Sequence, residues 1–350
     1  MVANSSDIIL SIVVPMFNEE DGVDAFFARV EPVAEAVVAP LRRPYEIVCV
    51  DDGSSDRTLE MLHAHRQRNP AIKIVSLSRN FGKDLALTAG LDHAQGSAVV
   101  PIDSDLQDPP EVIPELFARW LEGHEVVYAT RSSRDSDGVA KRASAGWFYR
   151  VHNMMADVKI PENTGDFRLM DRRVVEALSR LPERNRFMKG LFAWVGFKQA
   201  RVEYAREPRE HGKTKWKAWS LWNFGLDGIT SSSTVPLRIW SYIGGTIFLV
   251  ALAYAGYLIV RTLIYGADVP GYASLMVVLL FMGGINLLTL GIVGEYLGRI
   301  YTEVKRRPLY LVRERAGFDE IPATVPTEVQ EWSHRSTPEW ARLKTGTGGS

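Results

Sequence analysis

The stretch Tyr45-Glu-Ile-Val-Cys-Val-Asp-Asp-Gly-Ser-Ser-Asp56 joins a run of apolar residues to a cluster of short polar ones. A helical pattern follows and continues to Arg68. The apolar run suits a buried strand, and Gly53 suits a tight turn. Ser55 or Asp56 is placed to cap the helix that follows. The stretch therefore predicts one strand–loop–helix unit.

The same alternation recurs along the first 130 residues. Strands are predicted at residues 8–15, 45–50, 72–77, 98–102 and 126–129, with helices between them, for example 21–38 and 56–68. Strands that alternate with helices predict an α/β domain with a mostly parallel sheet. Ligands of such sheets bind at the carboxyl ends of the strands, so the polar residues after each strand are the candidates for chemistry.

The charge balance argues against a polyanionic partner such as nucleic acid. The 350 residues include 41 Lys and Arg against 42 Asp and Glu, which leaves no excess of positive charge. Cys49 is the single cysteine, so an intrachain disulfide is excluded and a reducing compartment is favoured. The N-terminal residues lack a basic region followed by an apolar run, so we expect no secretory signal peptide.

Two long uncharged runs occupy residues 239–260 and 272–293. Each is long enough to cross the roughly 30 Å hydrocarbon core of a bilayer as a helix. Two buried helices of a soluble bundle are the alternative, but uncharged runs above about 18 residues are uncommon in soluble folds. Basic residues gather before the first run and after the second. This distribution predicts that both ends of the hairpin lie in the cytoplasm.

These patterns predict five regions. Residues 1–210 form a cytosolic catalytic domain, and residues 131–145 are a mobile loop that closes over a substrate. Residues 211–237 are a basic, Trp-rich amphipathic segment that lies in the membrane interface. Residues 238–294 hold the two transmembrane helices. Residues 295–316 form a basic cytosolic segment that attracts anionic lipid headgroups, and residues 317–350 are a weakly ordered tail.

Two common nucleotide-binding motifs are incomplete or missing. Gly212-Lys-Thr214 resembles the end of a P-loop, but Glu207 stands where that motif needs its first glycine. No G-x-G-x-x-G sequence follows the first predicted strand, which makes a nicotinamide-dependent dehydrogenase an unsuitable interpretation.

Acidic residues instead follow two of the predicted strands. Asp51 and Asp52 precede the turn at Gly53 and are interpreted as acceptors for a base or for ribose hydroxyls, with a structural role in the turn as the alternative. Asp103 and Asp105 alternate after another strand, so their side chains point the same way. Two adjacent carboxylates repel unless a cation lies between them. Mg²⁺ or Mn²⁺ would remove that conflict and would clamp a diphosphate, with Gln107 as a further ligand.

Four stretches resemble the family 2 glycosyltransferases of the GT-A fold. They are Val14-Pro-Met-Phe-Asn-Glu-Glu20, Val50-Asp-Asp-Gly-Ser-Ser-Asp-Arg-Thr58, Ser78-Arg-Asn-Phe-Gly-Lys83 and Asp103-Ser-Asp-Leu-Gln-Asp-Pro-Pro-Glu111. Four later stretches extend the match to the polyprenyl-phosphate branch of this family, which includes dolichyl-phosphate mannose synthases and bacterial undecaprenyl-phosphate glycosyltransferases. They are Gly165-Asp-Phe-Arg-Leu-Met170, Arg186-Phe-Met-Lys-Gly190, Arg206-Glu-Pro-Arg209 and Gly294-Glu-Tyr-Leu-Gly-Arg299. The resemblance covers roughly residues 8 to 315.

The resemblance implies roles for individual residues. Asp166 matches the catalytic carboxylate of the family, and Asp105 is expected to serve catalysis through the metal. A turn acid after Gly165 is the alternative for Asp166. The expected metal ligands are Asp103, Asp105 and Gln107. The residues expected to bind the nucleotide are Pro15, Phe17, Asn18, Glu19, Asp51, Asp52, Lys83, Asp103 and Ser104.

Basic residues are needed to hold the acceptor phosphate at the membrane. The candidates are Arg131 and Arg134 in the predicted loop and Arg209, Lys213 and Lys215 near the interface. Attraction to anionic lipid is the alternative, worth about 1 kcal/mol per basic residue. We prefer the acceptor phosphate for Arg131 and lipid attraction for the basic residues between 299 and 315.

The resemblance implies transfer of a sugar from a nucleotide diphosphate sugar to undecaprenyl phosphate, with inversion and with Mg²⁺ or Mn²⁺. UDP-glucose is the preferred donor, and GDP-mannose or a modified UDP-sugar is the nearest alternative. A processive polysaccharide synthase and an inactive membrane scaffold are the others. Proteins of this family often form homo-oligomers, so a homo-oligomer is a possible assembly. The two uncharged runs and their basic flanks predict a multi-pass protein of the inner (plasma) membrane, with the catalytic domain and both termini in the cytoplasm.

Overall fold

The computed structural model describes residues 8–131, 164–184, 186, 188–205, 235–265 and 271–318. These residues divide into two compact units. The sheet unit holds the described residues before 206 and those from 307 onward. The hairpin unit holds those from 235 to 306. The chain therefore leaves the sheet unit, builds the hairpin unit, and returns.

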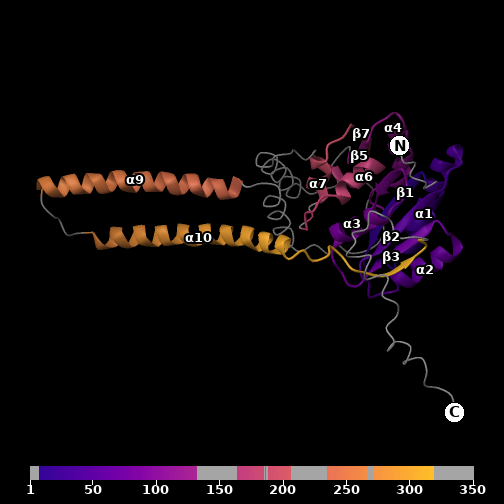
Figure 1. Ribbon diagram of the computed structural model, residues 1–350, viewed down its shortest axis with the longest axis horizontal. Helices are drawn as coiled ribbons and strands as arrows, with labels where there is room; N and C mark the ends of the chain where they lie inside the picture. The colour runs from indigo at the N-terminus through magenta and orange to yellow at the C-terminus, as the bar shows by residue number, and fades with distance from the viewer. Residues whose placement is uncertain are drawn as a thin grey trace, which may run out of the picture. The chain divides into compact units, whose positions relative to one another are not determined.

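The sheet unit is built on eight strands in the order β7-β5-β6-β4-β1-β2-β3-β8 (Figure 1). The central four strands, β4, β1, β2 and β3, are parallel neighbours. Their carboxyl ends therefore lie at one edge of the sheet, where a ligand of an α/β fold binds. The strands are β1 (Leu10–Met16), β2 (Tyr45–Asp51), β3 (Ile72–Leu77), β4 (Ala98–Pro101), β5 (Val126–Arg131), β6 (Thr164–Asp171), β7 (Gln199–Tyr204) and β8 (Val312–Ala316).

The sheet is mixed, with parallel pairings in the majority, as the expectation of a mostly parallel sheet requires. Four strand pairings are parallel and three are antiparallel. The antiparallel pairings come from β6, which is inserted between β4 and β5, and from β8, which pairs with β3. Neither strand was predicted, because neither shows the apolar run that marks a buried parallel strand.

Helices cover both faces of this sheet. One face packs against α1 (Val23–Val38), α2 (Thr58–Arg68) and α4 (Ile113–Leu121). The other face packs against α3 (Lys83–His93), α6 (Arg172–Ser179) and α7 (Met188–Trp194). Short 3₁₀ turns lie at η1 (Ala39–Leu41) and η2 (Pro110–Val112). Side chains alternate along β1, with Ile12 and Val14 in one core cluster and Val13 in the other, as a strand covered on both faces requires.

A glycine sets how closely α3 approaches the sheet. A Cβ atom at Gly90 would lie 2.3 Å from Cγ1 of Val13 and 3.1 Å from Cγ2 of Val50. No larger residue fits there without displacing the helix or the strand residues. Since α3 begins at Lys83, this contact helps to fix the position of Lys83 relative to the carboxyl ends of β1 and β2.

The predicted elements of the first 130 residues are confirmed with small shifts. The strand at 72–77 agrees with β3, and the other predicted strands differ from β1, β2, β4 and β5 by one or two residues at an end. The helices predicted from residues 21 and 56 begin two residues later, at Val23 and Thr58. The N-cap of the second helix is Arg57, which makes no side-chain cap, rather than Ser55 or Asp56 as expected. Asp56 lies one residue earlier and bonds the first residue of the helix, since its Oδ1 accepts from the Thr58 backbone N–H at 3.0 Å.

The hairpin unit consists of two long helices, α9 (Val235–Tyr265) and α10 (Tyr272–Val304). The predicted spans 239–260 and 272–293 lie inside them. Many large apolar side chains on both helices are exposed, for example Leu263 at 81% and Leu287 at 72%. Within the described residues, Phe281–Val304 is long and apolar enough to cross a membrane, by length and composition. An apolar surface of this extent suits contact with lipid.

The segment expected at 295–316 is not one juxtamembrane element. Helix α10 continues to Val304, and Val312–Ala316 form β8, an edge strand of the sheet. The basic residues 299–315 are therefore divided between the two units. Pairing with the edge of β3 gives the backbone groups of β8 hydrogen-bond partners within the sheet.

Several predicted regions lie outside the described residues. They are the loop at 132–145, the interfacial segment up to residue 234, and the tail from residue 319.

Candidate active site

Lys83 joins two carboxylates at the carboxyl edge of the sheet. Lys83 Nζ lies 2.7 Å from Asp103 Oδ1 and 2.9 Å from Asp166 Oδ2. Lys83 begins α3, Asp103 follows β4, and Asp166 lies in β6. The side chain of Asp166 is mostly buried, while those of Asp103 and Lys83 are more open. Three residues from distant parts of the sequence thus form one charged cluster.

The direction of β6 explains why Asp166 reaches this place. β6 runs antiparallel to β4, with Ala98 opposite Asp171 and Val99 opposite Met170. The start of β6 therefore lies beside the end of β4, where Asp103 follows. A parallel β6 would have placed Asp166 at the other end of the strands, beside the amino end of β4.

The cluster shifts the protonation of its members. Burial alone would raise the pKa of Asp166, but the ammonium groups of Lys83 and Lys189 lower it to about 2. Burial also opposes the charge on Lys83, yet the carboxylates of Asp103 and Asp166 raise its pKa. The neighbouring Asp84 behaves differently, because burial and the charge of Asp166 raise its pKa to about 7. Asp166 is therefore an anion at neutral pH, and Asp84 is close to its titration point.

The Asp103–Asp105 segment holds a turn with an unusual backbone. Leu106 is buried and has a φ of 55°, a left-handed conformation that leucine rarely adopts. The Gln107 backbone N–H donates to Asp105 Oδ1 at 3.2 Å. Ser104 and Asp105 are partly exposed on this turn. The strained turn thus holds Asp103 and Asp105 at the sheet edge.

The residues present fit a hard divalent cation. Asp103 and Asp105 provide carboxylate oxygens, which Mg²⁺ and Mn²⁺ prefer. Asp166 Oδ1 is buried and has no hydrogen-bond partner among the described residues. Those same residues contain no group of three or more Asp, Glu, His or Cys side chains arranged to hold a metal. A cation here would therefore take part of its coordination from oxygen atoms of a bound ligand, as Mg²⁺ commonly does with phosphates.

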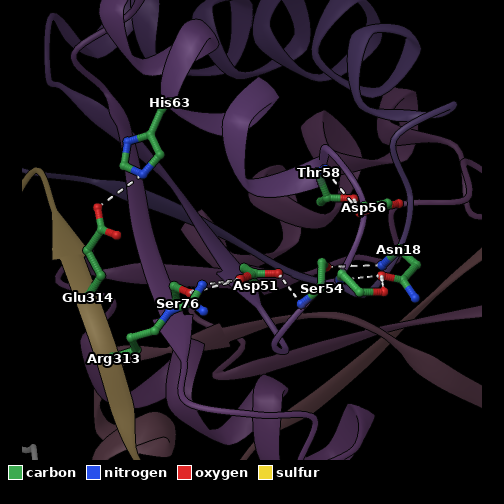
Figure 2. A network of polar contacts seen from close by, with 10 residues as sticks. Asn18, Asp51, Ser54, Asp56, Thr58, His63, Ser76, Arg313 and Glu314 are labelled. Carbon is green, nitrogen blue, oxygen red and sulfur yellow. Dashed lines mark hydrogen bonds and ion pairs between the residues drawn. The ribbon is translucent and has the colours of Figure 1, made fainter.

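The loops after β1 and β2 are tied together by hydrogen bonds. The Asn18 backbone N–H donates to Ser54 Oγ at 3.0 Å, and the Ser55 backbone N–H donates to Asn18 Oδ1 at 2.8 Å (Figure 2). The Glu19 backbone N–H donates to Thr58 Oγ1 at 2.9 Å. Asn18 has a φ of 52°, which asparagine tolerates better than most residues. Pro15, the penultimate residue of β1, is partly buried, and so is Phe17 just after the strand.

Asp51 and Asp52 are buried and bonded within the protein. Asp51 Oδ1 accepts from the Ser54 backbone N–H at 2.9 Å, and Asp51 Oδ2 accepts from Ser76 Oγ at 2.8 Å. Asp52 accepts from the backbone N–H groups of Phe81 and Gly82 at 2.7 and 2.9 Å. Burial raises the pKa of Asp52, and these two bonds oppose the rise. Both carboxylates therefore shape the loops at the sheet edge, the role weighed as the alternative to nucleotide binding.

Arg131 ends β5 and contacts a buried pair. Tyr204 donates from its hydroxyl to Asp108 Oδ1. Burial and the charge of Asp108 raise the pKa of Tyr204, while a hydrogen bond to Arg131 opposes the rise. Of the residues expected to hold the acceptor phosphate, Arg131 is described, and Arg134, Arg209, Lys213 and Lys215 lie outside the described residues.

Comparison with known proteins decides the family. The model for glycosyl transferase family 2 matches residues 11–179, and the GtrB C-terminal hairpin model matches residues 235–300. An uncharacterised glycosyltransferase of Synechocystis, sll0501, is 58% identical over 89% of this chain and 97% of that protein. The chain belongs to glycosyltransferase family 2.

Two further relatives of this glycosyltransferase carry more specific names. The SfII prophage-derived bactoprenol glucosyl transferase of Shigella flexneri is 49% identical over 87% of this chain and 97% of its own length. A prophage bactoprenol glucosyl transferase homolog of Escherichia coli K12 is 49% identical over 87% of this chain and 98% of its own. The family 2 domain and the C-terminal hairpin expected from the sequence are thus both present.

The structure adds residues to this glycosyltransferase site that the sequence did not single out. Asp84 and Lys189 both act electrostatically on Asp166. Arg313, on β8, lies 3.8 Å from Asp51. Lys189 lies in the stretch Arg186-Phe-Met-Lys-Gly190, so the resemblance to the family could have identified it from the sequence. Asp84 and Arg313 gave no comparable signal, because their positions depend on how α3 and β8 pack. The roles assigned to individual residues remain predictions.

Proposed function

We propose that this glycosyltransferase transfers glucose from UDP-glucose to undecaprenyl phosphate, with inversion at the anomeric carbon. The observation that carries the proposal is the cluster of Lys83, Asp103 and Asp166 at the carboxyl edge of the sheet. It offers a cation for a diphosphate and a buried carboxylate for the reacting sugar. The names of the relatives in Shigella flexneri and Escherichia coli support bactoprenol phosphate as the acceptor and glucose as the sugar.

The donor nucleotide would lie across the loops after β1 and β2. Asn18 and Glu19 are held there by hydrogen bonds to the loop after β2. The diphosphate would then lie toward Asp103 and Ser104. Lys83 is placed to move from the carboxylates to a diphosphate oxygen, where its charge would stabilise the leaving group.

In the reaction an oxygen of the acceptor phosphate attacks the anomeric carbon. The bond from that carbon to the diphosphate breaks, and UDP leaves with the electron pair. A phosphate monoester has its second pKa near 6, so the acceptor is already ionised at neutral pH. Asp166 is an anion. We therefore propose that Asp166 orients the acceptor and stabilises positive charge on the sugar, and that it does not act as a strong general base.

A Mg²⁺ or Mn²⁺ ion held by Asp103 and Asp105, with Gln107 nearby, would neutralise charge on the departing diphosphate. The oxygen donors of these residues and the hard character of the cations support this assignment.

The hairpin supports a lipid acceptor. Burying each methylene of a polyprenyl chain contributes about 0.8 kcal/mol, so such a chain stays in the bilayer. The enzyme must therefore work at the membrane surface. We infer a multi-pass protein of the plasma membrane with the sheet unit and both termini in the cytoplasm, from the basic residues that flank α9 and α10. Arg131, Arg134, Arg209, Lys213 and Lys215 are the proposed contacts of the acceptor phosphate.

The test is transfer of labelled sugar by the full-length protein in detergent. The assay contains undecaprenyl phosphate, Mg²⁺ or Mn²⁺, and separately UDP-glucose, modified UDP-sugars or GDP-mannose. Label should enter the lipid fraction from UDP-glucose, disappear with EDTA, and be lost in Asp166→Asn and Asp105→Ala variants that remain folded. Transfer from GDP-mannose alone would overturn the donor assignment. Full turnover of Asp105→Ala would overturn the metal assignment.

A further inference from the structure

Strand β8 brings an arginine to the nucleotide half of the site. β8 pairs antiparallel with β3, with Ser76 opposite Glu314 and Val75 opposite Arg315. Arg313 Nη2 donates to Ser76 Oγ at 3.0 Å and lies 3.8 Å from Asp51 Oδ2 (Figure 2). The residue comes after the hairpin in sequence, yet it contacts the carboxyl ends of β2 and β3.

The buried carboxylate of Asp51 is stabilised by a positively charged neighbour such as Arg313. The side chain of Asp51 is fully buried, with a relative exposure of 0%. A buried carboxylate is costly unless hydrogen bonds and a positive charge compensate it. The Ser54 backbone N–H and Ser76 Oγ supply the hydrogen bonds. Arg313 supplies a positive charge, directly at 3.8 Å and through Ser76.

The contacts continue from Asp51 into the loops proposed to bind the nucleotide. Asp51 Oδ1 fixes the backbone of Ser54. Ser54 Oγ then accepts from the Asn18 backbone N–H, and Asn18 Oδ1 accepts from Ser55. Figure 2 shows these residues as one line of contacts from β8 to the loop after β1. A change at Arg313 can therefore reach Asn18 through Ser76, Asp51 and Ser54.

The segment before β8 is anchored independently of Arg313. Tyr310 is buried and donates from its hydroxyl to Asp92 Oδ2 at 2.9 Å. The Ser78 backbone N–H donates to Leu311 O at 2.8 Å. β8 should thus keep its place when the guanidinium of Arg313 is removed, which separates the charge from the strand that carries it.

We propose that Arg313 is a positioning residue for the donor nucleotide, acting through Ser76 and Asp51 on the loop at Asn18 and Ser54. The inference rests on the proposed function, because it assumes that these loops bind the nucleotide of the donor. It assigns to the segment after the hairpin a part in donor binding.

The test measures UDP and GDP binding to the full-length protein in detergent by calorimetry. Arg313→Met keeps an unbranched apolar stem and removes the guanidinium and its charge. It should raise Kd for the nucleotide that the wild-type protein binds by about 10-fold, the loss expected for one hydrogen bond to a charged group. Arg313→Lys should recover most of the affinity. In turnover assays Arg313→Met should raise KM for the donor, with kcat and KM for the lipid close to the wild-type values.

Two further variants test the route. Ser76→Ala should weaken nucleotide binding, and the double variant with Arg313→Met should weaken it by less than the product of the two single effects, because both act on Asp51. Arg201→Met is the matched control. Arg201 lies on β7, at the opposite edge of the sheet, with a side-chain exposure of 59% against 50% for Arg313. It should bind nucleotide like the wild-type protein.

The outcomes separate the inference from the proposed function. If Arg313→Met lowers Tm but binds nucleotide with wild-type Kd, Arg313 is merely structural and the inference fails. An equal loss of nucleotide affinity in Arg201→Met would also overturn the inference. If the wild-type protein binds GDP and transfers mannose, the donor assignment fails, but an effect of Arg313→Met on GDP binding still supports the positioning role. If the wild-type protein binds neither nucleotide, both proposals fail.

Discussion

At the scale of single residues, Lys83 holds the two carboxylates of the site together. Removing its charge takes away the cation that contacts both Asp103 and the largely buried Asp166, and leaves Asp166 with the smaller effect of Lys189. We expect Lys83→Met to lower kcat by roughly 100-fold or more, because a preorganised charge at a leaving group has effects of this size. Steady-state transfer of labelled sugar to lipid measures this.

Lys198→Met provides the comparison for Lys83→Met. Lys198 is exposed, and its described hydrogen bonds use its backbone: the N–H donates to Glu125, and the carbonyl accepts from the backbone N–H groups of Glu125 and Val126. The control should keep wild-type turnover. A Lys83→Met enzyme with unchanged kcat would remove Lys83 from the site.

Asp92 makes stability depend on pH. Burial raises its pKa to about 7, against the opposing effects of the Tyr310 hydroxyl and Arg186, whereas an unfolded Asp titrates near 4. Between these values the folded protein keeps a proton that the unfolded chain has lost, so stability falls as the pH rises from about 4 to 7. The shift corresponds to about 4 kcal/mol at most.

Asp92→Asn should therefore make this dependence shallower. The amide oxygen still accepts from Tyr310, and no proton is lost on raising the pH. Tm of the detergent-solubilised variant, measured from pH 5 to pH 8, should fall less than that of the wild-type protein. An unchanged slope would mean that Asp92 titrates normally in the folded protein.

The residue types at the site could be predicted from sequence, but their contacts could not. Asp103 and Asp105 stood out because acidic residues after strands suggest metal and phosphate chemistry, and Asp166 stood out through the resemblance to the family. The bridge made by Lys83 depends on the start of α3 lying next to the end of β4. Asp51 and Asp52 were interpreted as ligand acceptors, and both oxygen pairs bond within the protein.

At the scale of elements, the packing of α3 on the sheet depends on Gly90. Gly90→Ala would place a Cβ atom 2.3 Å from Cγ1 of Val13. We expect a loss of about 1–3 kcal/mol in stability, the usual cost of overpacking a core. The loss should appear as a lower Tm. Gly22→Ala is the control, since its added Cβ would meet its nearest neighbour, Glu19 O, at an ordinary 3.7 Å. Equal Tm values for the two variants would contradict the close packing of α3.

The elements that could be predicted from the sequence were those with apolar side chains on one face or on both faces. β1 to β5 combine apolar runs with turn residues, so their approximate bounds followed from the sequence. β8, with the sequence Val-Arg-Glu-Arg-Ala, is an edge strand whose side chains are largely polar. Such a strand is stabilised by backbone pairing to β3, and pairing to a distant segment leaves no local pattern.

At the scale of the whole molecule, the sheet unit is discontinuous in sequence. A chain that ends at residue 234 would lack β8 and leave the outer edge of β3 unpaired. Replacing residues 235–306 with a flexible Gly-Ser linker would keep β8. We expect the linker protein to have the higher Tm and the tighter UDP binding of the two, since it retains Arg313 and the β3 pairing. Equal values would show that β8 adds nothing to the sheet unit.

The two-unit plan was partly visible in the sequence. Long uncharged runs marked the hairpin, because few other structures accept them. The return of the chain to the sheet as β8 could not be predicted from the sequence, because basic residues such as those between 299 and 315 are equally typical of a segment beside a membrane. Charge alone does not distinguish an arginine that faces lipid from one that compensates a buried aspartate.

The late position of β8 has a consequence for biosynthesis. A ribosome makes β3 long before β8, and it must make both hydrophobic helices in between. Until then the nascent sheet has an open edge at β3, a template for pairing with other chains. The sheet unit is therefore completed only after α9 and α10 have been made. A nascent chain that ends before residue 312 lacks Arg313 beside Asp51, so on the inference above it would bind nucleotide weakly until β8 has been made and paired with β3.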